Sequence, residues 1–153
     1  MIQITEPAAP GRAYWIVSGL LLVWALGYAW LVVNVLFVAS PEYFDELVTS
    51  GTILPGYSDY VQHLPVWVIA LLCLKAVTRL GGAVALVMRR RQAFTFFAWS
   101  LMLVLIIFTR GFLFHNVGSV EKPLQLSLEL LFFGVSIFAV FYAARTGLRG
   151  QLR

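Results

Sequence analysis

A long apolar stretch with charges near its middle constrains this chain more than any other feature. Residues 65–91, PVWVIALLCLKAVTRLGGAVALVMRRR, are apolar and long enough to cross a bilayer, yet they include Lys75 and Arg79. A charge at bilayer depth is costly, so such residues normally face protein or water and mark a functional or assembly site. Lys75 and Arg79 lie four residues apart, which places them on one face of a helix. We expect that face to point inward.

The composition indicates that a membrane is the natural solvent of this chain. Of its 153 residues, 61% are hydrophobic and 12% are charged, whereas about a quarter of the residues in a soluble domain are charged. The apolar runs predict four spans within a single membrane domain, residues 1–153. The spans are expected at residues 14–39, 65–88, 93–114 and 124–144. The predicted fold is therefore all-α, an integral membrane four-helix bundle.

The segment between the first two spans predicts a short amphipathic helix on the membrane surface. Ser40 can cap a helix, and Pro41 suits the first helical position. In the following residues, PEYFDELV, the apolar and acidic side chains fall largely on opposite sides. Gly51, Pro55 and Gly56 then predict a turn-rich loop. We expect both the helix and the loop in the first outer loop of the protein.

The distribution of basic residues predicts the orientation of the spans. Both chain ends and the connection between the second and third spans carry arginines: Arg12, Arg89, Arg90, Arg91, Arg145, Arg149 and Arg153. The opposite side carries only Lys122. Because positive residues stay on the cytoplasmic side, both termini should be cytoplasmic in a multi-pass protein.

Charged residues inside the spans can be compared by depth, at about 1.5 Å of rise per residue. Measured from the cytoplasmic ends of the spans, Arg79 lies roughly 14 Å up, Lys75 roughly 20 Å, Glu129 roughly 22 Å and Arg110 roughly 26 Å. Glu129 is therefore level with Lys75 and Arg110. We expect Glu129 to bridge to one of them, with Arg110 favoured because a short loop joins the third and fourth spans.

Three intramembrane cations against one anion leave a formal excess of positive charge, which has three interpretations. Backbone carbonyls, Asn34, tyrosines and water solvate the cations. Alternatively, the cations form a site for an anionic or polar ligand, such as a lipid headgroup or a carboxylate. In the third interpretation, an acidic residue of another subunit completes the pairing.

Motifs for catalysis, metals and cofactors give little signal. The sequence contains no HExxH, CxxC, glycine-rich phosphate loop or nucleophile elbow. His63 and His115 lie at the outer boundary of the membrane, where a surface or capping role is favoured over haem ligation. The basic residues are not gathered on a polar surface among aromatic side chains, so nucleic acid is not an expected partner. We expect no catalytic residues, no metal and no cofactor.

Several motifs, in their order, resemble a group of small, largely uncharacterised bacterial four-span inner-membrane proteins that are sometimes loosely labelled sugar transporters. They are an acidic, tyrosine-bearing first outer loop, an LPVW start to the second span, Gly81 and Gly82 followed by an apolar run to RRR, and the ending FYAARTGLRGQLR. The resemblance implies a bacterial inner membrane and a four-helix topology. Lys75 and Arg79 depart from it, because the resemblance implies a more uniformly apolar second span.

These observations favour a small non-enzymatic membrane protein, binding or transport-associated, with a polar intramembrane site. The residues expected in that site are Lys75, Arg79, Arg110, Glu129 and Asn34. One alternative is an accessory or assembly subunit of a larger membrane complex, and a second is a membrane redox protein. The expected partners are the lipid bilayer, an anionic lipid or small polar ligand, and further subunits in a homo-oligomer or a larger complex.

Overall fold

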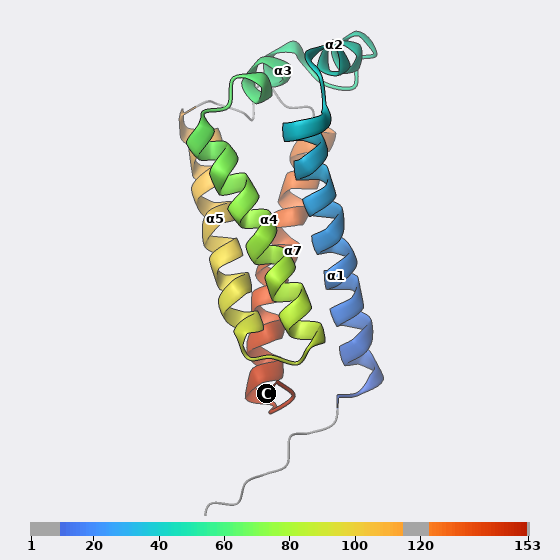
Figure 1. Ribbon diagram of the computed structural model, residues 1–153, viewed down its shortest axis with the longest axis vertical. Helices are drawn as coiled ribbons and strands as arrows, with labels where there is room; N and C mark the ends of the chain where they lie inside the picture. The colour runs from blue at the N-terminus through green and yellow to red at the C-terminus, as the bar shows by residue number, and fades with distance from the viewer. Residues whose placement is uncertain (1–9, 115–122, 153) are drawn as a thin grey trace, which may run out of the picture.

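Four long helices form the body of the protein in the computed structural model, which describes residues 10–114 and 123–152 (Figure 1). They are α1 (Arg12–Val33), α4 (Val66–Val87), α5 (Gln92–Phe114) and α7 (Pro123–Leu148). Each contains a segment long and apolar enough to cross a membrane. The described residues contain no strand. The prediction of an all-α four-helix membrane bundle is confirmed, and the chain is a multi-pass membrane protein.

The helix ends differ from the predicted spans by a few residues. A π-helical segment, η1 (Asn34–Val38), continues α1 and ends where Ala39 takes an extended conformation. The last helix continues to Leu148, four residues beyond the predicted limit at residue 144. Arg145 therefore belongs to its last turn, where a positive charge interacts favourably with the helix dipole.

Two short helices lie across one end of the bundle (Figure 1). The predicted surface helix is present as α2 (Pro41–Thr49), and the Ser40 hydroxyl caps it by accepting a hydrogen bond from the backbone N–H of Tyr43 at 3.3 Å. The prediction of a turn-rich loop after α2 is wrong in part, because residues Pro55–Gln62 form a further helix, α3. Its proline occupies the first turn, where the missing N–H costs nothing. We call this end of the molecule the α3 end.

Most of the described arginines lie at the opposite end, and we call it the arginine end. At this end α1 begins, α4 turns into α5, and α7 finishes (Figure 1). Arg89 lies in the turn with a φ of 59°, and its Nε donates a hydrogen bond of 2.9 Å to the carbonyl oxygen of Gln151. The predicted collection of positive residues on one side of the bundle is confirmed for those that the structure describes.

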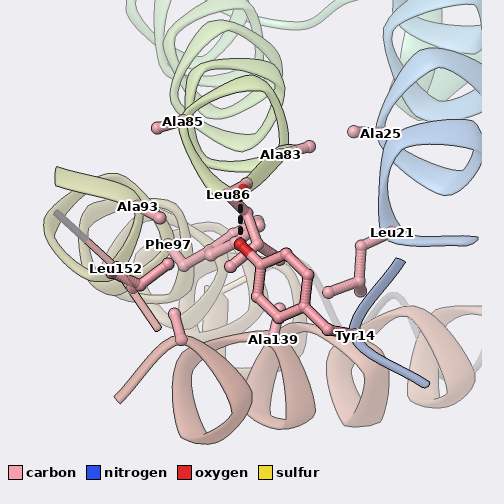
Figure 2. Close-up of a cluster of buried hydrophobic side chains, with 11 residues drawn as sticks. Tyr14, Leu21, Ala25, Ala83, Ala85, Leu86, Ala93, Phe97, Ala139 and Leu152 are labelled. Atoms are coloured by element: carbon pink, nitrogen blue, oxygen red, sulfur yellow. Dashed lines mark hydrogen bonds between the residues drawn. The ribbon is translucent and has the colours of Figure 1, made fainter. Parts of the chain in front are cut away.

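Small side chains pack the half of the bundle near the arginine end (Figure 2). Tyr14 is buried there, and its hydroxyl donates to the carbonyl oxygen of Leu86. The buried Leu86 carbonyl provides a partner for the Tyr14 hydroxyl inside the bundle. Gly82 admits the ring of Phe97, whose Cδ1 would lie 2.8 Å from an added Cβ.

Helix order determines which side chains meet in the interior. Along their lengths, α4 packs against both α1 and α5, and α5 packs against α7. Aromatic side chains span the remaining side of the bundle, where Tyr28 of α1 and Phe132 of α7 make an edge-to-face contact with centroids 6.2 Å apart. Side chains on the inner face of α4 therefore meet both α1 and α7.

Candidate intramembrane binding site

A cavity of about 190 Å³ lies between the four long helices and contains the charges singled out in the sequence. Lys75 and Arg79 reach it from α4, Glu129 from α7 and Tyr28 from α1. The rest of its lining is apolar: Leu72, Val104, Ile107, Phe108, Phe132 and Phe133. We call this space the central cavity. Two of the cations and the anion predicted to share one site therefore do so.

Arg79 is completely buried, with 0% of its side chain exposed. Its guanidinium carbon lies 4.0 Å from the centroid of the Trp24 ring and 4.2 Å from that of the Tyr28 ring. Aromatic faces attract a cation electrostatically, and the attraction is strongest when water is excluded. The two rings of α1 therefore replace part of the hydration that Arg79 loses inside the bundle.

Hydrogen bonding compensates the guanidinium only in part. Its Nη2 donates to the Ser136 hydroxyl at 2.8 Å, and that hydroxyl donates to the carbonyl oxygen of Phe132 at 2.7 Å. Within residues 10–114 and 123–152, Nε and Nη1 of Arg79 have no hydrogen-bond partner. Unmade hydrogen bonds from a buried charge are expensive. This arginine therefore keeps a strong unbalanced positive field at the cavity wall.

Lys75 is half-buried one helical turn nearer the α3 end. Its ammonium nitrogen lies 4.7 Å from the centroid of the Tyr28 ring, so this ring accommodates two cations. Lys75 is also close enough to interact electrostatically with Arg79, which repels it, and with Glu129, which attracts it. Because the Glu129 side chain is exposed on the bundle while it lines the cavity, its charge is only partly desolvated.

The charges around the central cavity do not cancel. Lys75 and Arg79 contribute two positive charges and Glu129 contributes one negative charge, so the formal sum is +1. The aromatic rings and Ser136 lower the cost of this excess without changing its sign. The arrangement is therefore suited to attract one further negative charge into an otherwise apolar space.

Arg110 points toward the α3 end. Its Nη1 donates a hydrogen bond of 3.1 Å to the hydroxyl of Tyr60 on α3, and its guanidinium carbon lies 5.1 Å from the centroid of the Trp67 ring. Arg110 does not line the central cavity. Its favoured bridge to Glu129 stays a prediction, and so does a bridge from Glu129 to Lys75, although these two residues line one cavity.

Asn34 lies apart from the central cavity. Its Nδ2 donates to the carbonyl oxygen of Trp30 in its own helix at 2.9 Å. It also lines a separate groove of about 390 Å³, together with Ser40 and Tyr43 at the junction of η1 and α2. The sequence placed Asn34 in one site with the buried cations, and the structure separates them.

The histidines have unequal outcomes. His63 follows α3, and its Nδ1 is hydrogen-bonded to the carbonyl oxygen of Asp59 at 2.9 Å, which is a capping role. His115 lies outside the described residues. The capping role predicted for His63 is therefore confirmed.

Tyrosines are expected from the sequence as cation partners in general, but Trp24, Tyr28 and Ser136 are not among the predicted site residues. A signal for the aromatic pair was present. Trp24 and Tyr28 are four residues apart, as are Lys75 and Arg79 on the facing helix, so each pair presents one continuous stripe. No comparable signal marks Ser136, because a single hydroxyl is common in apolar helices.

Comparisons with protein-family models, curated proteins and solved structures give no match for this chain.

Proposed function

We propose that this protein is a small non-enzymatic membrane protein, binding or transport-associated, and that its central cavity takes a small anionic or polar ligand. The observation that carries the proposal is the sharing of one cavity by Lys75, Arg79 and Glu129, two cations and one anion. Charges at bilayer depth usually mark ligand or ion sites because a purely structural helix avoids their cost. One bound anion would neutralise the formal excess.

The difference in burial between Arg79 and Lys75 supports a binding role. The guanidinium of Arg79 lies against the rings of Trp24 and Tyr28 and donates a hydrogen bond to Ser136, so three contacts hold its position. Lys75 is half-buried and is the cation with surface available to a ligand. A fixed buried charge behind a contact-making amine is a preorganised anion site, in which little reorganisation is needed on binding.

We further propose that the arginine end is cytoplasmic and that the protein resides in a bacterial inner membrane. The charge asymmetry between the two ends supports this orientation, since short basic segments stay on the cytoplasmic side. The α3 end, with the acidic helix α2, then faces outward. Labelling of single cysteines at the two ends in intact cells tests the orientation, and reaction of the arginine end from outside would refute it.

Ligand-dependent thermal unfolding of the purified protein tests the binding proposal. Sodium acetate, hexanoate and phosphate are compared with choline chloride and glucose at equal ionic strength. An anion at 100 times its dissociation constant stabilises the folded state by about 2.7 kcal/mol. This corresponds to a rise of roughly 5 to 10 °C for a chain of this size.

Lys75→Met should lose that response, because it removes the accessible ammonium and keeps an apolar side chain of similar length. Arg91→Met is the matched control, since Arg91 is exposed at the arginine end and does not line the central cavity. An anion response of equal size in both variants would place binding at the surface. The absence of any anion response in the wild-type protein would refute the proposal.

A second candidate function, as an accessory subunit of a membrane complex, is favoured by exposed glycines in the spans. At Gly27 and Gly134 an added Cβ would meet nothing within 4 Å, so both leave room for close approach of another helix. Purification from native membranes in a mild detergent distinguishes this function. A stoichiometric partner chain would support it, and recovery of the chain alone would refute it.

A further inference from the structure

A second cavity adjoins the central cavity on the side toward the α3 end. It has a volume of about 140 Å³, and Tyr57, Tyr60 and Val61 of α3 contribute to its lining. We call it the vestibule. Four residues line both cavities and so form a shared wall: Leu72, Ile107, Phe108 and Glu129. Rearrangement of these side chains would join the two spaces into one elongated site.

The two cavities differ in charge along this direction. Among the described residues that line the vestibule, Glu129 in the shared wall is the one acidic or basic side chain, and most of the others are aliphatic or aromatic. The cations Lys75 and Arg79 line only the central cavity. The combined space is therefore positive at its inner end and apolar at its outer end.

We infer, on the basis of the proposed binding function, that the ligand is a linear monocarboxylate that occupies both cavities. Its carboxylate lies beside Lys75 in the central cavity, and its aliphatic chain passes Leu72 into the vestibule. The ammonium of Lys75 has donors that a carboxylate oxygen accepts. Arg79 has no exposed surface, so it acts on the carboxylate through its charge rather than by contact.

The number of charges on the ligand follows from the charges around it. One negative charge cancels the formal excess of +1, whereas a second would restore an uncompensated charge inside the membrane. Glu129 in the shared wall also repels a negative group near the vestibule. A dicarboxylate of the same length should therefore bind much more weakly than a monocarboxylate.

Protection of an introduced thiol measures occupancy directly. The native Cys73 is replaced by serine, and Leu72→Cys is introduced because this position lines both cavities. The protein is placed in lipid nanodiscs, and the rate of its reaction with the neutral reagent methyl methanethiosulfonate is followed. Arg91→Cys in the same background is the control, because Arg91 is exposed at the arginine end and lines neither cavity.

Acetate, butyrate, hexanoate and octanoate are compared as protecting ligands. The concentration that halves the rate at Leu72→Cys should fall about fourfold for each added methylene while the chain still fits in the vestibule. Hexanoate should protect at least tenfold better than 1-hexanol or adipate, which share its chain length but carry no charge or two charges. The rate at Arg91→Cys should not change. Empty nanodiscs correct the free concentration for partition into lipid.

Two variants distinguish the contribution of the ligand's carboxylate from that of its aliphatic chain. Lys75→Met should weaken protection by every acid in the series, because it removes the contact common to all of them. Val61→Phe should leave butyrate unchanged and weaken octanoate at least fivefold, because it fills part of the vestibule from the exposed helix α3. A chain-length limit near hexanoate or octanoate would indicate a free small acid. Protection that continues to rise to oleate would indicate an acid released from membrane lipid.

Failure of this inference is distinct from failure of the proposed function. If anions stabilise the protein through Lys75 but protection does not depend on chain length, the binding site stands and the monocarboxylate is excluded. Equal protection by hexanoate and 1-hexanol would also overturn the inference, because the carboxylate would then contribute nothing. If neither assay responds to any anion, both proposals are wrong.

Discussion

The hydrogen bond from Arg79 to Ser136 gives the sharpest test of how the buried cation is held. Ser136→Ala removes the hydroxyl that accepts the guanidinium's hydrogen bond, at 2.8 Å, and leaves the two aromatic rings in place. Neutral interhelical hydrogen bonds in membranes contribute about 0.6 kcal/mol on average, and charge assistance roughly doubles this value. Because both residues are buried, we expect a loss of about 1.5 kcal/mol in the free energy of unfolding.

The matched control for this substitution is Ser127→Ala on the same helix. Ser127 and Ser136 each donate to the carbonyl oxygen four residues earlier at 2.7 Å, so both substitutions remove the same local bond. Ser127 is exposed, and the hydrogen bond described for it is that local one. Equilibrium unfolding in mixed micelles, followed by circular dichroism, should therefore give a change near zero for Ser127→Ala.

A double-mutant cycle assigns the difference to Arg79. In an Arg79→Met background, Ser136→Ala should cost no more than Ser127→Ala, because the guanidinium is no longer present. The coupling between positions 79 and 136 should then be about 1.5 kcal/mol. Equal costs for the two serine substitutions in the wild-type background would refute the account of Arg79.

Two further substitutions test the packing of the bundle and the charge balance of its cavity. Gly82→Ala should destabilise the protein by about 2 kcal/mol through overpacking against Phe97. Gly27→Ala should be neutral, because the added Cβ meets nothing within 4 Å. Equal unfolding free energies for the two variants would contradict the close contact between Gly82 and Phe97. Without ligand, Glu129→Gln should lower the unfolding free energy by about 1 kcal/mol, because Lys75 loses its attractive neighbour. The same substitution should raise the affinity for an anion. Weaker anion binding in a titration would contradict the charge balance of the cavity.

Much of the architecture could be predicted because it depends on local pattern. Apolar runs of about 20 residues fix the number of spans, and the arginines fix which connections share an end. The spacing of Lys75 and Arg79 fixes their common face. The helix α3 was missed because PGYSDYVQ lacks an apolar run and its glycine and proline resemble a turn. In the structure this helix contributes Tyr57, Tyr60 and Val61 to the lining of the vestibule.

The interior of the site was harder to predict because it depends on helix rotation and neighbours. Depth alone correctly placed Glu129 at the same height as Lys75, since the rise per residue is fixed in a helix. Depth does not determine direction, so Arg110, at a similar height, was favoured although it points to Tyr60. The packing of Arg79 against Trp24 and Tyr28 required knowing that α1 lies beside α4.

In the proposed function, Lys75 and Arg79 of α4 hold an anion inside the membrane. Native mass spectrometry of the protein released from its own membranes in lipid nanodiscs detects such an anion. We expect the wild-type protein and the Arg91→Met control to retain a small acid, and Lys75→Met to lose it. Release of the wild-type protein with no bound acid, or with the same acid as Lys75→Met, would contradict the claim.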